Sequence, residues 1–213
     1  MTAEDIPGTA GLPPHAPGMR IGLFGGSFNP VHEGHRLVAL QCLERLALDA
    51  VWLLVSPGNP LKDRSELAPL ADRLGAARAL IRHPRVRVTG FEMAHGFFYT
   101  VQTISWLVRT CPGVRFVWIM GSDSLSQFAR WERWQEIAAL VPMAVYARPG
   151  SRFSAMSSPA ATALGRYRLR EGDAPALAGR RPPAWVYLHG LSSDQSSTAI
   201  RRARNAMTGR AAG

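Results

Sequence analysis

The sequence predicts an α/β protein with a Rossmann-like, doubly wound and mainly parallel sheet that carries helices on both faces. Two observations support this fold class. Short apolar segments of strand length alternate along the chain with segments of helical periodicity, and the loops after the strands are rich in glycine, proline and polar residues. Such alternation favours parallel strands joined by right-handed crossovers, with ligand-binding loops at the carboxyl ends of the strands.

The first predicted elements are a strand, a glycine-rich loop and a helix. Residues 20–24 form a short apolar strand, and residues 25–26 open the loop that follows it. Apolar residues then recur at helical spacing from about residue 34 to residue 47. A second apolar strand covers residues 51–55, and it ends at the Pro-, Gly- and Asn-rich residues 56–60, which we expect to form a loop.

The rest of the chain continues the same alternation. Residues 150–183 are polar and rich in Pro, Ala and Gly, and they show no pattern from which we assign an element. Elsewhere, periodicity predicts helices over residues 69–82, 99–110, 132–140 and 198–206, and apolar or alternating patterns predict strands over residues 86–88, 114–120, 143–147 and 185–188.

The length and composition predict one domain. A chain of 213 residues suits a single α/β domain, which we place at residues 19–208, after a proline-rich and flexible N-terminal tail over residues 1–18. No stretch approaches the roughly 18 to 20 apolar residues of a membrane span, and the start lacks the basic region of a signal peptide. Cys42 and Cys111 lie far apart in apolar segments, which is typical of reduced thiols. We therefore expect a cytoplasmic protein with no membrane partner.

The net charge of +10 raises the alternative of a basic nucleic-acid-binding module, which is a different class of function. Lys62 is the sole lysine, so 24 of the 25 basic residues are arginines, and they are scattered along the chain. A nucleic-acid interface usually gathers its basic residues on one face or in one tail. The charge pattern therefore predicts no nucleic-acid partner.

The most informative block runs from Gly25 to His35, between the first strand and the first helix. Glycines let the backbone approach an anion, and the first turn of a helix directs its N–H groups and its positive dipole end at the same place. His32 and His35 are three residues apart, so both imidazoles can face one pocket and donate hydrogen bonds to phosphate. We expect the side chain of His35 to lie at the loop mouth and not in the core. A histidine alone is more often a surface or core residue, but this context predicts a phosphate site.

This block resembles the H-x-G-H signature of the nucleotidylyltransferase superfamily. The resemblance implies transfer of a nucleoside monophosphate from a nucleoside triphosphate on a Rossmann-like fold. Two other motifs do not fit the sequence. A Walker A loop requires Gly-Lys-Ser/Thr, whereas the sole lysine follows Leu61, and the interval between His32 and His35 differs from that of H-E-x-x-H.

Three further blocks resemble bacterial nicotinate-nucleotide adenylyltransferases, and all matches together span about residues 20–205. The first block follows the central strand and reads GSDSL and then FARWERW, from residue 121 to residue 134. Its Asp123 can accept hydrogen bonds from ribose hydroxyls, and Trp131 offers an aromatic face to a pyridine ring. In the family the first tryptophan of this pair stacks on the pyridine, so we assign Trp134 to the core.

The other two blocks lie at predicted helix starts. Tyr99-Thr-Val-Gln-Thr resembles the family's Tyr-Thr-x-x-Thr, and the resemblance implies that main-chain N–H groups near Thr100 and Glu132 bind the pyridine carboxylate, which favours nicotinate over its amide. Ser196-Ser-Thr-Ala-Ile-Arg resembles the start of the family's last helix. Hydroxyls and N–H groups there form an anion site, and Arg201 can bind the triphosphate one turn later.

The loop Asn59-Pro-Leu-Lys resembles a family loop in which a histidine often precedes the lysine. Leu61 departs from that pattern and leaves Lys62 as the cation of the loop, while Gln195 stands where an apolar residue is usual. We interpret Lys62 as a phosphate ligand, and the alternative is an ordinary solvated loop lysine.

The resemblance implies transfer of AMP from ATP to nicotinate mononucleotide, which yields nicotinate adenine dinucleotide and pyrophosphate in NAD biosynthesis. The phosphate of the acceptor is itself the nucleophile, so the protein has to position two anions and stabilise charge. The expected catalytic residues are His32, His35, Lys62 and Arg201. The expected ATP-binding residues are Gly25, Gly26, Ser27, Phe28, His35, Ser196, Ser197, Thr198 and Arg201. The expected mononucleotide-binding residues are Ser27, Phe28, Asn59, Lys62, Thr100, Asp123, Trp131 and Glu132.

The expected partners are therefore two small molecules, ATP and nicotinate mononucleotide. Mg²⁺ is expected to arrive with ATP and to be held by substrate oxygens and water, so we expect no metal site built from protein ligands. Within the superfamily, nicotinamide mononucleotide or another phosphorylated acceptor such as phosphopantetheine is the alternative, and Asp123 and Trp131 argue against the latter. The sequence does not determine the oligomeric state, and a homo-oligomer is compatible with it.

Overall fold

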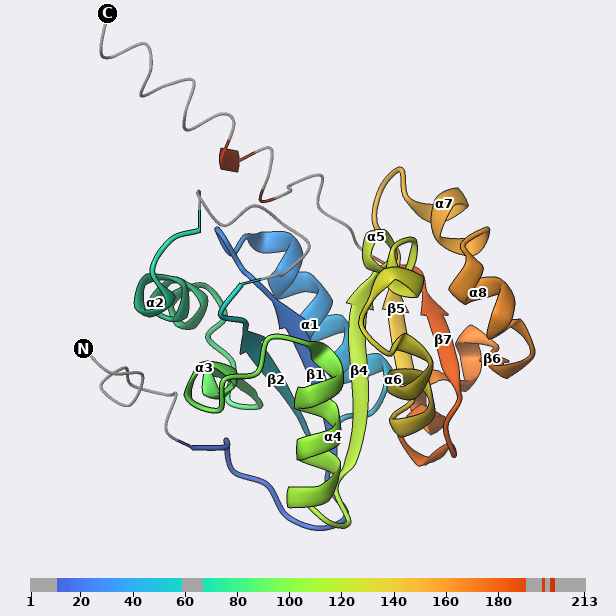
Figure 1. The fold of residues 1–213 in the computed structure, drawn as a ribbon, viewed down its shortest axis with the longest axis horizontal. Helices are drawn as coiled ribbons and strands as arrows, with labels where there is room; N and C mark the ends of the chain where they lie inside the picture. The colour runs from blue at the N-terminus through green and yellow to red at the C-terminus, as the bar shows by residue number, and fades with distance from the viewer. Residues whose placement is uncertain (1–10, 59–66, 191–196, 198–199, 202–213) are drawn as a thin grey trace, which may run out of the picture.

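The computed structural model describes residues 11–58, 67–190, 197, 200 and 201. Its centre is a seven-stranded sheet with the strand order β3-β2-β1-β4-β5-β7-β6, in which every neighbouring pair is parallel. In Figure 1, α4 and α6 lie in front of this sheet and α1 lies behind it. The predicted Rossmann-like α/β fold is therefore confirmed, and the sheet is parallel throughout the described residues.

The six strands predicted from the sequence are all present, with ends that differ by a few residues. A seventh, β6, is an edge strand of two residues, which is too short to show an alternating pattern. The strands are β1 (Arg20–Gly26), β2 (Ala50–Val55), β3 (Val86–Thr89), β4 (Arg115–Gly121), β5 (Met143–Tyr146), β6 (Arg168–Leu169) and β7 (Trp185–Leu188).

Four predicted helices are present as α1 (Glu33–Arg45), α2 (Leu70–Leu80), α4 (Thr100–Thr110) and α6 (Trp134–Leu140). The elements that the sequence did not reveal are mostly too short for a periodic pattern, and several fill the segment 150–183. They are α3 (Phe91–Ala94), α5 (Ser122–Leu125), η2 (Phe128–Arg130), α7 (Arg152–Met156), α8 (Pro159–Ala163), η3 (Gly165–Tyr167) and η4 (Glu171–Gly179). The predicted helix 198–206 lies largely outside the described residues.

The hydrophobic core has two layers, one on each face of the sheet. In β2, Trp52 and Leu54 belong to the layer that packs under α4 and α6, whereas Leu53 and Val55 belong to the layer that packs under α1 and α2. All four side chains are at most 1% exposed. Successive side chains of a strand point to opposite faces, so a central strand covered on both faces is apolar at every position. This explains the unbroken apolar run of residues 51–55.

Part of the predicted N-terminal tail lies against the domain. Pro13 is buried, and the ring of His15 packs edge-on against Trp52 with 5.7 Å between ring centroids. The main-chain N–H of Gly18 donates a hydrogen bond to the carbonyl oxygen of Gly113 over 2.8 Å. The domain boundaries given above stay a prediction.

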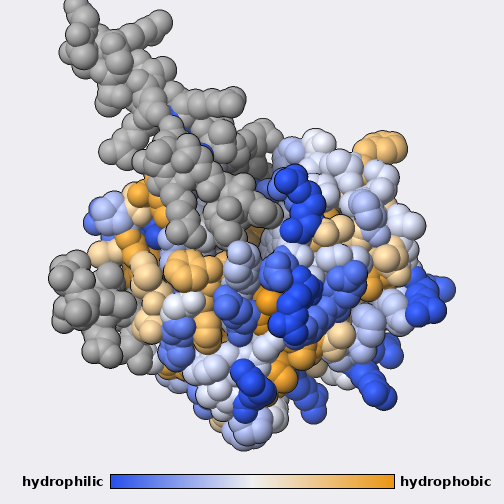
Figure 2. All heavy atoms as spheres, viewed as in Figure 1, coloured by the Kyte–Doolittle hydropathy of each residue, from blue (hydrophilic) through white to orange (hydrophobic). Residues whose placement is uncertain are grey.

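The surface of the described part mixes polar and apolar residues. Strongly hydrophilic residues are spread over the face shown in Figure 2, with apolar residues between them. Several arginines are held in ion pairs, such as Arg20 with Asp49 and Arg36 with Glu33. None of the helices in the described ranges combines the length and the apolar character needed to cross a membrane.

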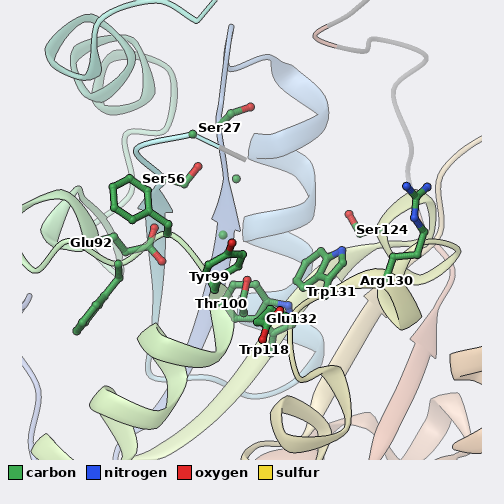
Figure 3. A pocket seen from close by; sticks show the side chains of 15 residues that line it. Ser27, Ser56, Glu92, Tyr99, Thr100, Trp118, Ser124, Arg130, Trp131 and Glu132 are labelled. Carbon is green, nitrogen blue, oxygen red and sulfur yellow. The ribbon is translucent and has the colours of Figure 1, made fainter. Parts of the chain in front are cut away.

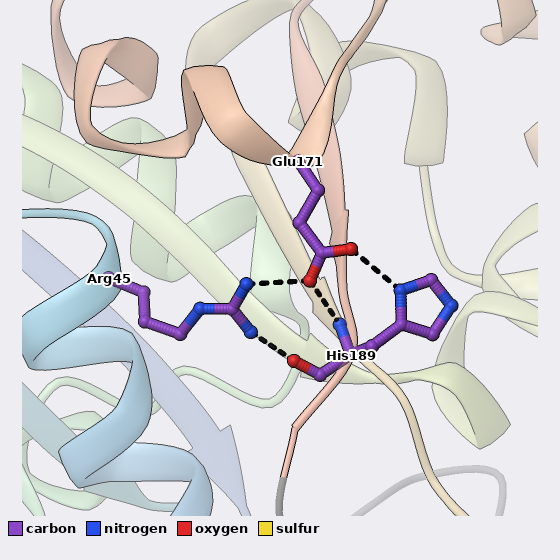
Figure 4. A network of polar contacts seen from close by, with 3 residues as sticks. All are labelled: Arg45, Glu171 and His189. Atoms are coloured by element: carbon purple, nitrogen blue, oxygen red, sulfur yellow. Dashed lines mark hydrogen bonds and ion pairs between the residues drawn. The ribbon is translucent and has the colours of Figure 1, made fainter.

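A network of Arg45, Glu171 and His189 joins the end of α1, the start of η4 and the residue after β7 (Figure 4). Glu171 Oε1 accepts hydrogen bonds from Arg45 Nη2 (2.6 Å) and from the main-chain N–H of His189 (2.7 Å). Its second oxygen lies 2.7 Å from His189 Nδ1, and Arg45 also donates to the carbonyl oxygen of His189. The network therefore ties the residue after β7 to the end of α1 and to the start of η4.

We expect the substitution Glu171→Gln to lower the free energy of unfolding at pH 7 by about 1 kcal/mol, because it removes the charge that strengthens these half-buried hydrogen bonds. Burial raises the pKa of Glu171, but the bonds from His189 and Arg45 outweigh it and lower the pKa from 4.5 to about 2. The stabilisation should therefore be complete above pH 4.5 and lost as the pH falls toward 2. Urea unfolding of the wild type and of the variant at several pH values measures this contribution to the free energy of unfolding. An equal loss in Glu44→Gln, an exposed carboxyl of α1, would mean that the network contributes nothing.

Candidate active site

The candidate site lies where the strand order reverses, between β1 and its neighbour β4. The chain proceeds from β1 through β2 to β3 on one side, and it then returns to form β4 on the other side. The carboxyl ends of parallel strands meet at one edge of the sheet, and a crevice forms where two adjacent connections leave in opposite directions. The loops after β1, β2, β4 and β5 therefore open on the same edge.

The loop after β1 folds tightly against the sheet. A Cβ atom at Gly25 would overlap the ring of Trp118 on β4, so only glycine lets the strand approach this closely. Phe28 adopts a left-handed backbone conformation with a φ of 46°, and its side chain is 2% exposed. Its ring meets the ring of His35 edge-on at 4.9 Å. The side chain of Phe28 thus packs against the ring of His35 and does not face solvent.

His32 and His35 lie side by side at the start of α1, with ring centroids 3.9 Å apart. The main-chain N–H of His32 donates to Nδ1 of His35 over 3.2 Å. Nδ1 must therefore be unprotonated, which leaves the proton of the neutral ring on Nε2. The expectation that the side chain of His35 lies at the loop mouth and not in the core was wrong, because His35 is 8% exposed, and the neighbouring His32 is 4% exposed. Phe28 covers the ring of His35, and the sequence pattern did not reveal this.

Both imidazoles are neutral at pH 7. Burial, followed by the charge of Arg148, lowers the pKa of His32 from 6.5 to about 4. Burial, followed by His32 and Arg148, lowers the pKa of His35 to about 2. Both ring nitrogens of His32 are also buried without a hydrogen-bond partner within the described ranges. A buried polar group is normally paired, so this ring is suited to a hydrogen bond with a ligand.

The loop after β5 brings in Arg148, a cation that the sequence reasoning missed. Arg148 Nε lies 3.5 Å from Asp123 Oδ1, and its main-chain N–H donates to the buried Ser122 Oγ over 2.8 Å. The charge of Arg148 also lowers the pKa of His32 and of His35, so this residue acts on the histidine pair while it is paired with Asp123 of the loop after β4. Its position directly after a predicted parallel strand was a signal that could have identified it.

The last described residues approach the same loop. Ser197 Oγ donates to the carbonyl oxygen of Pro30 over 2.9 Å, and Arg201 Nη1 donates to the carbonyl oxygen of Asn29 over 2.6 Å. The structure therefore brings together the loop after the first strand, the loop after the central strand, and Ser197 and Arg201. This convergence is the geometric condition on which the sequence-based hypothesis depends.

A pocket of about 360 Å³ opens beside the glycine loop (Figure 3). In that view Ser27 and Ser56 lie at its upper edge, and Thr100, Trp131 and Glu132 lie at its lower edge. Among its lining residues, the sequence identified Gly25, Gly26, Ser27, Thr100, Trp131 and Glu132, and it did not identify Ser56, Gly58, Glu92, Phe97, Phe98, Tyr99, Trp118, Ser124 and Arg130. Most of the missed residues are apolar or small, and such side chains carry no chemical signal in a sequence.

Other residues singled out in the sequence do not line this pocket or lie outside the described ranges. Asp123 and Phe28 are not among the lining residues, although Ser124, next to Asp123, is one of them. Trp134 packs against Phe128 and the core, in agreement with its assignment. Four predicted residues lie outside the described ranges, namely Asn59, Lys62, Ser196 and Thr198. Among the residues that are described, no cluster of three or more His, Cys, Asp or Glu side chains could hold a metal ion.

Comparison with known proteins agrees with this geometry. A family model described as cytidylyltransferase-like matches residues 23–203. A Methylorubrum extorquens (strain PA1) protein named "Probable nicotinate-nucleotide adenylyltransferase" is 56% identical over 183 residues, which cover 86% of this chain and 99% of that protein. The chain belongs to the nicotinate-nucleotide adenylyltransferase family. The resemblance inferred from the sequence blocks is thereby confirmed, and the chain is a nucleotidyltransferase.

Other members and one solved structure extend the comparison. A Rhizobium meliloti (strain 1021) protein with the same name is 51% identical over 187 residues, covering 88% of this chain and 100% of that protein. The fold resembles that of Plasmodium falciparum nicotinic acid mononucleotide adenylyltransferase complexed with NaAD, with a TM-score of 0.65 and 14% sequence identity. That match covers 86% of this chain and 83% of the other. At this identity the likeness supports the fold alone.

In this family member a buried arginine of α2 holds two loops of the site together. Arg73 is 3% exposed, and its Nη1 donates to the carbonyl oxygens of Ser27 (2.8 Å) and Ser56 (2.7 Å). Its Nε donates to the carbonyl oxygen of Ala68 over 2.8 Å. One guanidinium therefore fixes the loops after β1 and β2, both of which line the pocket. The sequence showed Arg73 only as one arginine of an amphipathic helix.

We expect Arg73→Met to lower the free energy of unfolding by about 2–4 kcal/mol, because three carbonyl oxygens lose their donor where water cannot easily replace it. Chemical denaturation measures the change. Arg78→Met is the matched control, since Arg78 is exposed on the same helix and its substitution should cost far less. Equal losses in the two variants would show that Arg73 does not hold the loops.

Proposed function

We propose that this protein transfers AMP from ATP to nicotinate mononucleotide and releases pyrophosphate. One observation carries the proposal. The loop from Gly25 to Ser27 lines the pocket, and the same loop continues into the neutral histidine pair at the start of α1. A site for a flat ring and a site for phosphate are therefore parts of one continuous surface, as the joining of two nucleotides requires.

The phosphate part of the site suits the triphosphate of ATP. The first turn of α1 offers N–H groups and the positive end of a helix dipole, and neutral imidazoles donate hydrogen bonds without taking up a proton. Arg201 and Arg148 add positive charge from the last helix and from the loop after β5. In this proposal ATP brings its own Mg²⁺, and Lys62 supplies a further cation to the phosphates.

The pocket suits the pyridine nucleotide. Trp131 is half-buried, and its ring meets Phe128 edge-on at 5.4 Å, which leaves it placed to stack on a pyridine ring. The main-chain N–H groups near Thr100 and Glu132 then bind the carboxylate, and Asp123 binds ribose hydroxyls. The names of the curated relatives support nicotinate mononucleotide as the acceptor.

The reaction needs no protein nucleophile. An oxygen of the mononucleotide phosphate attacks the α-phosphorus of ATP, the bond to the bridging oxygen of the β-phosphate breaks, and pyrophosphate leaves with that electron pair. The residues of this chain align the two substrates and stabilise the negative charge that develops on the transferred phosphate. Incubation with ATP and each pyridine mononucleotide, with the product identified by mass, tests the proposal and separates nicotinate from nicotinamide acceptors.

We expect His35→Asn to lower turnover at saturating substrates by about 100-fold, because a donor to the phosphates is lost. The oxygen of asparagine can still accept the hydrogen bond from His32, so the helix start should persist. Pyrophosphate release measures the effect, and chemical denaturation checks the fold. His83→Asn is the matched control, since His83 Nδ1 also accepts a main-chain hydrogen bond, from Arg85. Turnover near that of the wild type in His35→Asn would remove His35 from the chemistry.

We expect Trp131→Ala to raise the KM for nicotinate mononucleotide about tenfold, which corresponds to the loss of one ring-stacking contact. The KM for ATP should change far less, because Trp131 lies in the ring pocket and not at the histidine pair. Steady-state kinetics with each substrate varied in turn measure both values. Equal increases for the two substrates would mean that Trp131 has only a structural role.

A further inference from the structure

The wall of the pocket contains a buried carboxyl group that the proposed reaction does not use. Glu92 of α3 is 7% exposed and is one of the lining residues. Figure 3 shows its carboxyl group directed toward the interior of the pocket. Thr103 Oγ1, which is fully buried in α4, donates to Glu92 Oε1 over 2.6 Å. The side chain is therefore held in place by a neutral donor.

The surroundings of Glu92 contain few charges. Tyr99, Arg130 and Glu132 line the same pocket, while the ends of β1 and β2 contribute only glycine and serine to it. Directly after α3, His95 is exposed, and its ring packs on Trp106. In the part of the chain that the structure describes, Glu92 forms no ion pair with Arg or His. A buried carboxylate without a cation is unfavourable, so the neutral acid is stabilised relative to water.

The protonation of Glu92 consequently changes close to neutral pH. Burial raises the pKa of Glu92 from 4.5 to about 7, although the hydrogen bond from Thr103 acts in the opposite direction. Thr100 lies one turn before Thr103 on α4, on the same side of the helix. The carboxyl group of Glu92 thus faces the region where the substituent of the pyridine ring is proposed to bind.

We propose that Glu92 is a specificity-determining residue. Its protonation state determines whether the pocket favours an acidic or an amide substituent on the pyridine ring. This inference rests on the proposed function, because it assigns the pocket to the pyridine ring. A neutral Glu92 tolerates a nearby carboxylate, whereas an ionised Glu92 repels it and can accept a hydrogen bond from an amide. Near and above pH 7, binding of nicotinate mononucleotide therefore includes partial uptake of a proton from solvent by Glu92, and binding of nicotinamide mononucleotide does not.

The first test is the pH dependence of acceptor choice. The ratio of the KM for nicotinate mononucleotide to the KM for nicotinamide mononucleotide should rise about tenfold between pH 6 and pH 9, if carboxylate binding raises the pKa of Glu92 by about one unit. Both acceptors carry the same phosphate, so its titration cancels in the ratio. In Glu92→Gln the ratio should be independent of pH, because glutamine does not titrate. In the control Glu44→Gln, an exposed carboxyl outside the pocket, the ratio should rise as in the wild type.

A second measurement does not depend on the folding of any variant. Calorimetric titration of the wild-type protein at pH 8, in buffers with different ionisation enthalpies, counts the protons taken up with each mononucleotide. We expect nicotinate mononucleotide to take up more protons than nicotinamide mononucleotide, by about 0.4 proton at pH 8 for a rise of about one unit in the pKa of Glu92. Equal proton uptake, or a KM ratio that is flat or falls with pH in the wild type, would overturn the role of Glu92.

Failure of the proposed function has a different signature. If neither mononucleotide releases pyrophosphate from ATP or binds in the calorimeter, the assignment of the pocket itself is wrong. If both mononucleotides react and the ratio of their KM values does not change with pH, only the role of Glu92 is wrong. A ratio that still rises with pH in a folded Glu92→Gln variant would assign the titration to another group and would also overturn the inference.

Discussion

The chemistry of the site depends on one hydrogen bond, from the main-chain N–H of His32 to Nδ1 of His35. This bond satisfies an N–H group at the start of α1 and at the same time fixes the tautomer of the imidazole. The ring of Phe28 packs edge-on against the same imidazole. Rotation of the imidazole would therefore break both the hydrogen bond and this ring contact. The helix start, the orientation of the histidine and its ability to donate a hydrogen bond are therefore one structural unit.

The loops around this unit are held by side chains that bind main-chain atoms of distant segments. Arg73 binds the carbonyl oxygens of the loops after β1 and β2, and Ser122 binds the main-chain N–H of Arg148 after β5. A Cβ atom at Gly121 would collide with Asp123 Oδ1 and approach Arg148 Nε within 2.8 Å, so a larger residue there would displace the side chains of this ion pair. The arrangement of the loops at the carboxyl ends of the strands thus depends on the sheet and on a few polar contacts that join one loop to another.

Much of the fold could be predicted from the sequence, because each long strand or helix carries its own periodic pattern. The apolar run of β2 and the stripe of α4 needed no knowledge of their neighbours. Short elements such as β6 and α3 could not be predicted, since two to four residues contain no full period. In the site, the histidines were singled out because their chemistry and spacing form a motif, and Trp131 was singled out through the family resemblance. Arg73, Arg148 and Glu92 were missed because their roles depend on burial and on partners far away in the chain.

The low basicity of the two imidazoles has a consequence in mildly acidic solution. An ordinary histidine would gain a proton as the pH falls from 7 by one or two units, and its ring would stop acting as an acceptor. At His35 that proton would compete with the helix start itself, because Nδ1 is already occupied by the backbone. Burial removes this competition in mildly acidic solution, so the shape of the loop between β1 and α1 stays independent of pH there.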